Sequence, residues 1–111
     1  MKLVGRIPRT SVLDGAVVRV PYPPFDVLVS QVGQEYFGIE DACNHAGQSL
    51  SEGPRHGDRI VCPMHGYVFD LKTGELLQPR GLCDHQRRFV CETEGDEIVI
   101  WDPFQIAIGI L

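Results

Sequence analysis

The sequence predicts an all-β protein with the form of an antiparallel β-sandwich, and two observations support this fold class. Short runs rich in Val, Ile, Leu and Phe alternate with turn signals built from Gly, Pro and Asp, which is the pattern of consecutive strands joined by tight connections. No segment repeats its apolar residues at the spacing of an amphipathic helix. The predicted strands are residues 2–7, 16–20, 25–32, 35–40, 59–62, 67–71, 87–93 and 97–101.

The first two predicted strands end at prolines. Residues 2–7 run up to Pro8, and residues 16–20 run up to Pro21. Proline has no backbone N–H to donate to a sheet ladder, so both strands are expected to stop there. An Asp-Gly pair between them predicts a turn.

The third and fourth strands predict a hairpin. Residues 25–32 follow a Pro-Pro pair, which a central strand would not tolerate. A Gly-Gln pair then separates them from residues 35–40, as in a tight turn. This hairpin leads the chain directly to Cys43.

The remaining strands form two further pairs. Residues 59–62 and 67–71 lie between Gly-containing turn signals and predict a small sheet of their own. Residues 87–93 and 97–101 predict an antiparallel pair joined by a Glu-Gly-Asp turn. The sequence contains no internal repeat and no low-complexity segment.

Length and charge restrict the function classes. The 111 residues predict one domain, and 15 acidic against 10 basic residues give a net charge of −5. No basic block suggests a nucleic-acid partner. The start of the chain lacks the composition of a signal or transit peptide, and no apolar run reaches the roughly 18 residues of a membrane span. We therefore expect a soluble, cytoplasmic protein.

Two Cys/His pairs are the candidate metal ligands. Cys43 and His45 form a C-x-H motif, and after sixteen intervening residues Cys62 and His65 belong to a C-P-x-H motif. Thiolate and imidazole both bind iron, zinc and copper, so the residue types leave the metal open. Structural zinc sites usually group cysteines with cysteines and histidines with histidines along the chain. One Cys and one His in each loop instead suits a two-metal cluster.

These motifs resemble the Rieske family, whose ligand signature is C-x-H followed by C-P-x-H-G. The resemblance extends into the flanking sequence, at Gly53-Pro54, Tyr67 to Asp70, Leu71 to Gly74 and Pro79. It implies one [2Fe-2S] cluster per chain, with histidines in place of two of the four cysteines on one iron. Cys43 and Cys62 would then bind the inner iron, and His45 and His65 the outer iron.

The resemblance also implies a domain organisation. In this family a small cluster-binding β subdomain is inserted into a base formed by both ends of the chain. Residues 42–75 would be the subdomain, and residues 1–41 and 76–111 the base, within a single Rieske domain spanning residues 1–111.

The function implied is that of a soluble, low-potential Rieske-type ferredoxin serving a multicomponent ring-hydroxylating oxygenase. Such a protein carries one electron at a time from a flavin-dependent NAD(P)H reductase to a separate terminal oxygenase. We expect it not to be an enzyme itself. An oxygenase would need a further domain with a mononuclear iron site, and only His56 and His85 remain outside the cluster motifs.

Two alternatives stay open. The small subunit of an assimilatory nitrite reductase shares the family's fold, although many such subunits lack the cluster ligands. A zinc-binding structural module would be a different class of protein, without colour and without redox chemistry.

Two positions after the second motif predict a low reduction potential. High-potential family members have a serine and a tyrosine hydroxyl there, whereas this chain has Tyr67 and Phe69. The disulfide that joins the ligand loops in high-potential members is excluded as well, because the corresponding positions are Gln48 and Met64.

Several residues near the motifs carry weaker expectations. Gly47, Gly53 and Gly66 either let backbone amides approach the cluster sulfides or are ordinary turn glycines. Pro79 either resembles the proline that covers the cluster in this family or is an ordinary turn proline. His85 is either part of a docking surface or a solvated basic turn.

The two cysteines outside the motifs and the C-terminal residues are expected to pack against other parts of the protein or against a partner. Cys83 and Cys91 are expected to be buried thiols that behave as small apolar residues. Residues 104–111 are almost wholly apolar. They are predicted either to cover the chain's own sheet or to form a contact with a second copy of the chain or with another partner.

Overall fold

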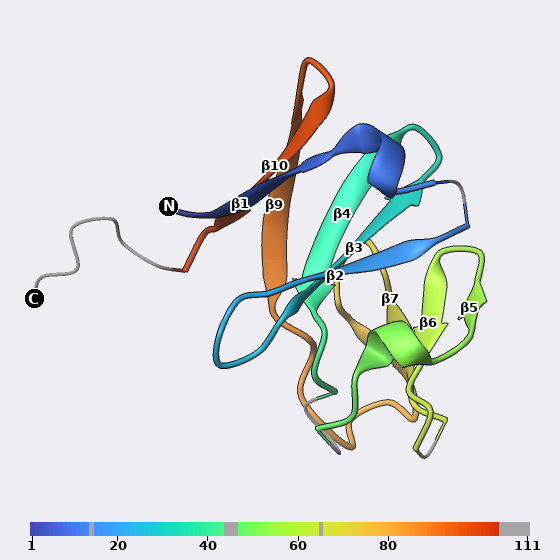
Figure 1. Ribbon diagram of the computed structural model, residues 1–111. Helices are drawn as coiled ribbons and strands as arrows, with labels where there is room; N and C mark the ends of the chain where they lie inside the picture. Colours follow the sequence, from blue (N-terminus) through green and yellow to red (C-terminus); the bar gives the residue numbers. More distant parts are fainter. Residues whose placement is uncertain (14, 44–46, 65, 105–111) are drawn as a thin grey trace, which may run out of the picture.

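The computed structural model describes residues 1–13, 15–43, 47–64 and 66–104 (Figure 1). This part of the chain is nearly all β, which confirms the predicted fold class. It contains two short 3-10 helices, η1 (Arg9–Ser11) and η2 (Leu50–Glu52). Its strands are β1 (Lys2–Pro8), β2 (Val17–Val20), β3 (Val27–Val32), β4 (Glu35–Glu40), β5 (Arg55–His56), β6 (Arg59–Val61), β7 (Val68–Asp70), β8 (Leu76–Gln78), β9 (Arg88–Glu94) and β10 (Glu97–Asp102).

Six strands form one antiparallel sheet in the order β1-β10-β9-β4-β3-β2. Two of its hairpins have two-residue turns, since Val32 pairs with Glu35 and Glu94 pairs with Glu97. Gly95 has a φ of 60° in the second of these turns, a conformation that glycine adopts without strain. Both hairpins were predicted, and β4 has the predicted boundaries.

The six-stranded sheet curls around a core of its own. Val27 and Val29 of β3 pack in one buried cluster with Ile98 and Ile100 of β10, although β9 and β4 lie between these strands in the sheet. The two halves of the sheet must therefore face each other across this core, which we call the base core (Figure 1).

Strand β3 also supports a second core on its other face. Successive side chains of a strand point to opposite faces, so Leu28 points away from the base core, and its partner Ile39 on β4 does the same. Both belong to a second buried cluster, which we call the ligand core. Its buried members are Leu28, Ile39, Cys43, Leu50, Ile60, Cys62, Phe69, Leu71 and Leu76.

The ligand core lies beneath a four-stranded antiparallel sheet in the order β5-β6-β7-β8. Strands β6 and β7 were predicted, whereas β5 and β8 were missed. Arg55 and His56 of β5 show no apolar alternation, and Leu76–Gln78 is only three residues long. Both short strands form because they pair with β6 and β7.

Arg55 joins the small sheet to the large one. Its guanidinium donates through Nη1 to the carbonyl oxygen of Ala16 at 3.1 Å and through Nη2 to that of Gln31 at 2.7 Å. This side chain therefore holds the four-stranded sheet against the edge of the base.

Two further observations concern membrane insertion and the C-terminal end. Within the described residues, no helix has the length and apolar character needed to cross a bilayer. Residues 105–111, on which the predicted homo-oligomer contact depends, lie outside the described part of the chain.

Candidate metal centre

Cys43 and Cys62 are brought together by the ligand core. Cys43 follows β4 and Cys62 follows β6, and their residues are 1% and 0% exposed. Both belong to one cluster with Leu50 and Phe69. His45 and His65, the two other predicted ligands, lie outside the described residues.

The loop that begins at Cys43 is closed by two backbone hydrogen bonds. The N–H of Cys43 donates to the carbonyl oxygen of Gln48 at 2.8 Å, and the N–H of Gly47 donates to that of Cys43 at 2.6 Å. Gly47 has a φ of 74°, so a glycine is favoured at this turn.

The loop that begins at Cys62 repeats this arrangement. The N–H of Cys62 donates to the carbonyl oxygen of Tyr67 at 2.7 Å, and the N–H of Gly66 donates to that of Cys62 at 3.0 Å. Gly66 has a φ of 75°. In both loops the cysteine is therefore the first residue of a turn whose fifth residue is a left-handed glycine. The two loops present their cysteines in equivalent ways.

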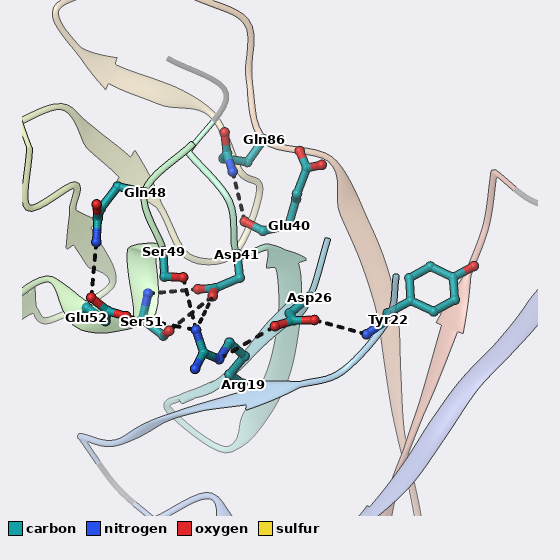
Figure 2. A network of polar contacts seen from close by, with 10 residues as sticks. All are labelled: Arg19, Tyr22, Asp26, Glu40, Asp41, Gln48, Ser49, Ser51, Glu52 and Gln86. Atoms are coloured by element: carbon teal, nitrogen blue, oxygen red, sulfur yellow. Dashed lines mark hydrogen bonds and ion pairs between the residues drawn. The ribbon is translucent and has the colours of Figure 1, made fainter. Parts of the chain in front are cut away.

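A network of polar contacts holds the base of the first loop (Figure 2). Asp41 is only 2% exposed, and its carboxylate accepts from the N–H of Ser51 at 2.8 Å and from the Ser51 hydroxyl at 3.1 Å. The Arg19 guanidinium donates to the Ser49 hydroxyl at 3.0 Å and lies 3.8 Å from the Asp41 carboxylate. Ala42 and Ser49 also form an isolated antiparallel bridge. Both ends of the loop are thus fixed to each other.

Gly53 sets how closely the end of η2 approaches the residues that flank Cys62. A Cβ atom placed on Gly53 would overlap the carbonyl oxygen of Val61 and come within 3.1 Å of Cδ of Pro63. These two residues flank Cys62. Close backbone contact with β6 therefore accounts for Gly53, while left-handed turns account for the other two glycines.

Gln86 is a buried polar residue beside the first loop. Its side-chain amide donates to the carbonyl oxygens of Glu40 and Ala42. Sequence reasoning missed both Asp41 and Gln86, because a polar residue between strands is ordinarily solvated and no local pattern marks these two as buried.

His85 has a structural role that neither sequence expectation contained. Its Nδ1 atom accepts a hydrogen bond from the N–H of Leu76 at 2.9 Å. The imidazole thereby closes the base of the loop that carries Pro79, Leu82 and Cys83. Pro79 and Leu82 are exposed in this loop.

The two remaining cysteines lie in different environments. Cys83 is half-buried against the ligand core, and burial raises the pKa of its thiol, with further contributions from Asp84 and Cys62. Cys91 packs against the base core, where burial raises its pKa to about 12. A thiol with so high a pKa is a poor metal ligand at neutral pH, because metals bind the thiolate.

The described residues fit a cluster that takes half of its ligands from thiolates. Two buried cysteines share one core, and two equivalent loops present them. The surrounding side chains are apolar, which limits access of water and stabilises a neutral rather than a charged centre.

Comparison with known proteins identifies the family. A model of the Rieske [2Fe-2S] domain matches residues 7–81, well over half of the chain. The chain belongs to the Rieske [2Fe-2S] domain family. A Rieske domain carries a single [2Fe-2S] cluster, as predicted for this chain.

Curated relatives of this Rieske chain include ferredoxin components of dioxygenases. It is 35% identical over 86 residues to the ferredoxin component of biphenyl 2,3-dioxygenase from Rhodococcus jostii (strain RHA1), covering 78% of this chain and 79% of that one. It is 37% identical over 78 residues to the 3-phenylpropionate/cinnamic acid dioxygenase ferredoxin subunit of Escherichia coli (strain K12), covering 69% and 73%.

Solved structures share the fold. The ferredoxin of Sphingomonas yanoikuyae B1 superposes with a TM-score of 0.75 at 28% identity, over 93% of this chain and 98% of that one. A chain from the complex of reduced oxygenase and oxidized ferredoxin in carbazole 1,9a-dioxygenase gives a TM-score of 0.79 at 27% identity, over 96% and 95%.

Proposed function

We propose that this chain is a one-electron carrier that passes electrons from its Rieske cluster to a separate terminal oxygenase. The observation that carries the proposal is the pair of equivalent loops, which presents two buried cysteines to one core in a chain whose relatives are named as ferredoxin components. A flavin-dependent NAD(P)H reductase would supply the electrons.

Four residues would hold the cluster. Cys43 and Cys62 would bind the inner iron through their thiolates, and His45 and His65 would bind the outer iron through their imidazoles. When bound, the cluster supplies a site that accepts and releases a single electron. The chain itself would hold both loops in place in the oxidised and the reduced state.

The residues after the second loop support a low reduction potential. Hydrogen-bond donors near a cluster tune its potential. Phe69 is fully buried in the ligand core and has no hydroxyl to donate, and Tyr67 packs at the edge of the same core. We place the potential in the lower part of the range of roughly −150 to +300 mV that Rieske centres span.

The proposal extends to organisation and location. Residues 1–111 would act as one domain in the cytoplasm, with residues 42–75 as the cluster-binding subdomain. Self-association through residues 105–111 is a separate proposal, which sedimentation of the full chain at several concentrations would test.

The test begins with protein purified without air or chelator. Two irons and two acid-labile sulfides per chain, with a reduced Rieske signal in electron paramagnetic resonance (EPR), are expected. Reduction by NADH and a flavoprotein reductase should bleach the visible spectrum, and a terminal oxygenase should restore it. Zinc without sulfide would overturn the proposal in favour of a structural module.

A further inference from the structure

We propose that Gln86 is a positioning residue that holds the Cys43 loop in register with the Cys62 loop. The inference rests on the proposed function, because it assigns the role of a residue toward the same cluster. Gln86 belongs to neither Cys/His motif, and it follows the second motif by some twenty residues.

The side chain of Gln86 holds the segment that enters the first loop. Its Nε2 atom donates to the carbonyl oxygen of Glu40 at 2.8 Å and to that of Ala42 at 2.7 Å, and the first of these bonds is drawn in Figure 2. The amide group has two hydrogens, so one is available for each acceptor. Ala42 immediately precedes Cys43, and the residue at position 86 is 2% exposed. Losing this donor would leave two carbonyl groups without their buried partner.

The backbone of Gln86 is fixed to the segment that leaves the second loop. Its N–H donates to the carbonyl oxygen of Gly74 at 2.7 Å. The N–H of Gly74 in turn donates to the carbonyl oxygen of Asp70 at 2.7 Å, at the end of β7. Strand β7 follows the Cys62 loop and pairs with β6, which precedes that loop.

The contact between Gly74 and Gln86 leaves no room for a side chain at position 74. Gly74 has a φ of 77°, and a Cβ atom placed there would overlap the carbonyl oxygen of Gln86. Gln86 therefore links two segments. Its backbone contacts the segment that follows the Cys62 loop, and its side chain contacts the segment that precedes the Cys43 loop.

Such a link matters for a cluster shared between two loops. Each loop supplies half of the ligands, so a displacement of one loop relative to the other changes the ligand geometry at both irons. Supporting residues that lock the ligand-bearing segments determine how well a metal site is pre-organised. Gln86 acts on the cluster through Ala42 and Cys43, by fixing the backbone that carries the thiolate.

The test compares two substitutions at Gln86 with two controls in the holoprotein. Gln86→Glu keeps the shape but replaces the donor by a carboxylate, and Gln86→Met keeps the length without any polar atom. Gln34→Glu makes the same charge change in the exposed β3–β4 turn, far along the hairpin from the ligand loops. Tyr22→Phe removes a different partly buried hydrogen bond, the 2.7 Å bond to the Asp102 carboxylate.

Three readouts are measured on each variant: the g values of the reduced cluster, the reduction potential, and the half-time of iron release to a chelator. Both Gln86 variants should show altered g values and a release half-time at least about tenfold shorter, as expected for the loss of two buried hydrogen bonds. The controls should keep the wild-type g values and change the half-time by less than about twofold, because Gln34 lies in the β3–β4 turn and the Tyr22 hydroxyl bonds to Asp102 of the base. A shift in reduction potential seen only in Gln86→Glu would report the added charge. Loss of positioning should instead shift the reduction potential of both Gln86 variants.

The outcomes separate this inference from the proposed function. Wild-type protein without iron and sulfide would overturn the proposed function. Loaded wild type with Gln86 variants that match it in g values and release would overturn only the role of Gln86. If the Gln86 variants keep the wild-type g values and Tyr22→Phe releases iron as fast as they do, the role of Gln86 is merely structural. That result would also overturn the inference. If Gln86→Met does not fold, Gln86→Glu and the shorter donor Gln86→Asn carry the same comparison.

Discussion

The base core and the ligand core are built by different means. The base core takes alternate residues from neighbouring strands, such as Val27 and Val29 or Ile98 and Ile100. The ligand core collects single residues from strands, a 3-10 helix and three loops. Buried polar groups, chiefly Asp41 and Gln86, surround its loops. Hydrophobic alternation thus accounts for the base core, whereas the ligand loops are also held by specific side-chain hydrogen bonds.

The largest expected effect separates the cysteines of the two cores. Cys62→Ala should abolish cluster binding, because it removes a thiolate from the ligand core. Cys91→Ala, the matched change in the base core, should leave two irons and two sulfides per chain. Iron and sulfide analysis with visible spectroscopy checks both, and a fully loaded Cys62→Ala protein would contradict the ligand assignment.

A cavity in the base core should destabilise the fold without changing the metal centre. Ile98→Ala removes a fully buried side chain, so we expect about 2–5 kcal/mol less free energy of unfolding. Chemical denaturation of the holoprotein measures this loss. The g values of the reduced cluster should stay as in the wild type, and a change in them would show that the two cores are coupled.

A methyl group at Gly53 should affect the ligand end specifically. The added Cβ would overlap the carbonyl oxygen of Val61, and relief of the overlap must move η2 away from β6. We expect Gly53→Ala to lower the free energy of unfolding by about 1–3 kcal/mol, as overpacking does, and to speed the release of iron. Gly5→Ala is the control, since a Cβ there meets nothing within 4 Å. Equal iron release from both variants would refute this role of Gly53.

The smallest effect concerns pH. Burial raises the pKa of Glu40 more than nearby Arg87 lowers it. An acid whose pKa is raised by folding stabilises the fold when protonated, and this contribution is lost as the pH rises through the folded-state pKa. Glu40→Gln should therefore be more stable than wild type at pH 7, by less than about 1 kcal/mol because the side chain is only partly buried. The difference should vanish below about pH 4, near the ordinary pKa of a glutamate.

Denaturation curves of wild type and Glu40→Gln across this pH range provide the check. Asp102 serves as the opposite case. Burial would raise the pKa of its carboxyl, but hydrogen bonds from Tyr22 and Arg87 outweigh this and lower it. Its stabilising contribution is present above the ordinary pKa and is lost only in stronger acid. A stability advantage of Glu40→Gln over wild type that grows as the pH falls would contradict the raised pKa of Glu40.

The strands show how far local sequence signals reach. β4 was predicted with its correct boundaries, since a tight-turn signal precedes it and its apolar residues mark its extent. β5 and β8 were missed because two or three residues carry too little pattern. They exist as strands only through hydrogen bonds to β6 and β7.

The sequence by itself determined the all-β class, the hairpins and the candidate ligands, because turn residues, alternation and motif spacing act over a few neighbouring residues. Only the tertiary structure decided that the two cysteine loops are equivalent, that Gly53 abuts β6, and that Gln86 links one loop to the other. Gln86 binds carbonyl groups 44 and 46 residues away. Whether such a polar side chain is buried or solvated depends on how distant segments pack, and no local pattern contains that information.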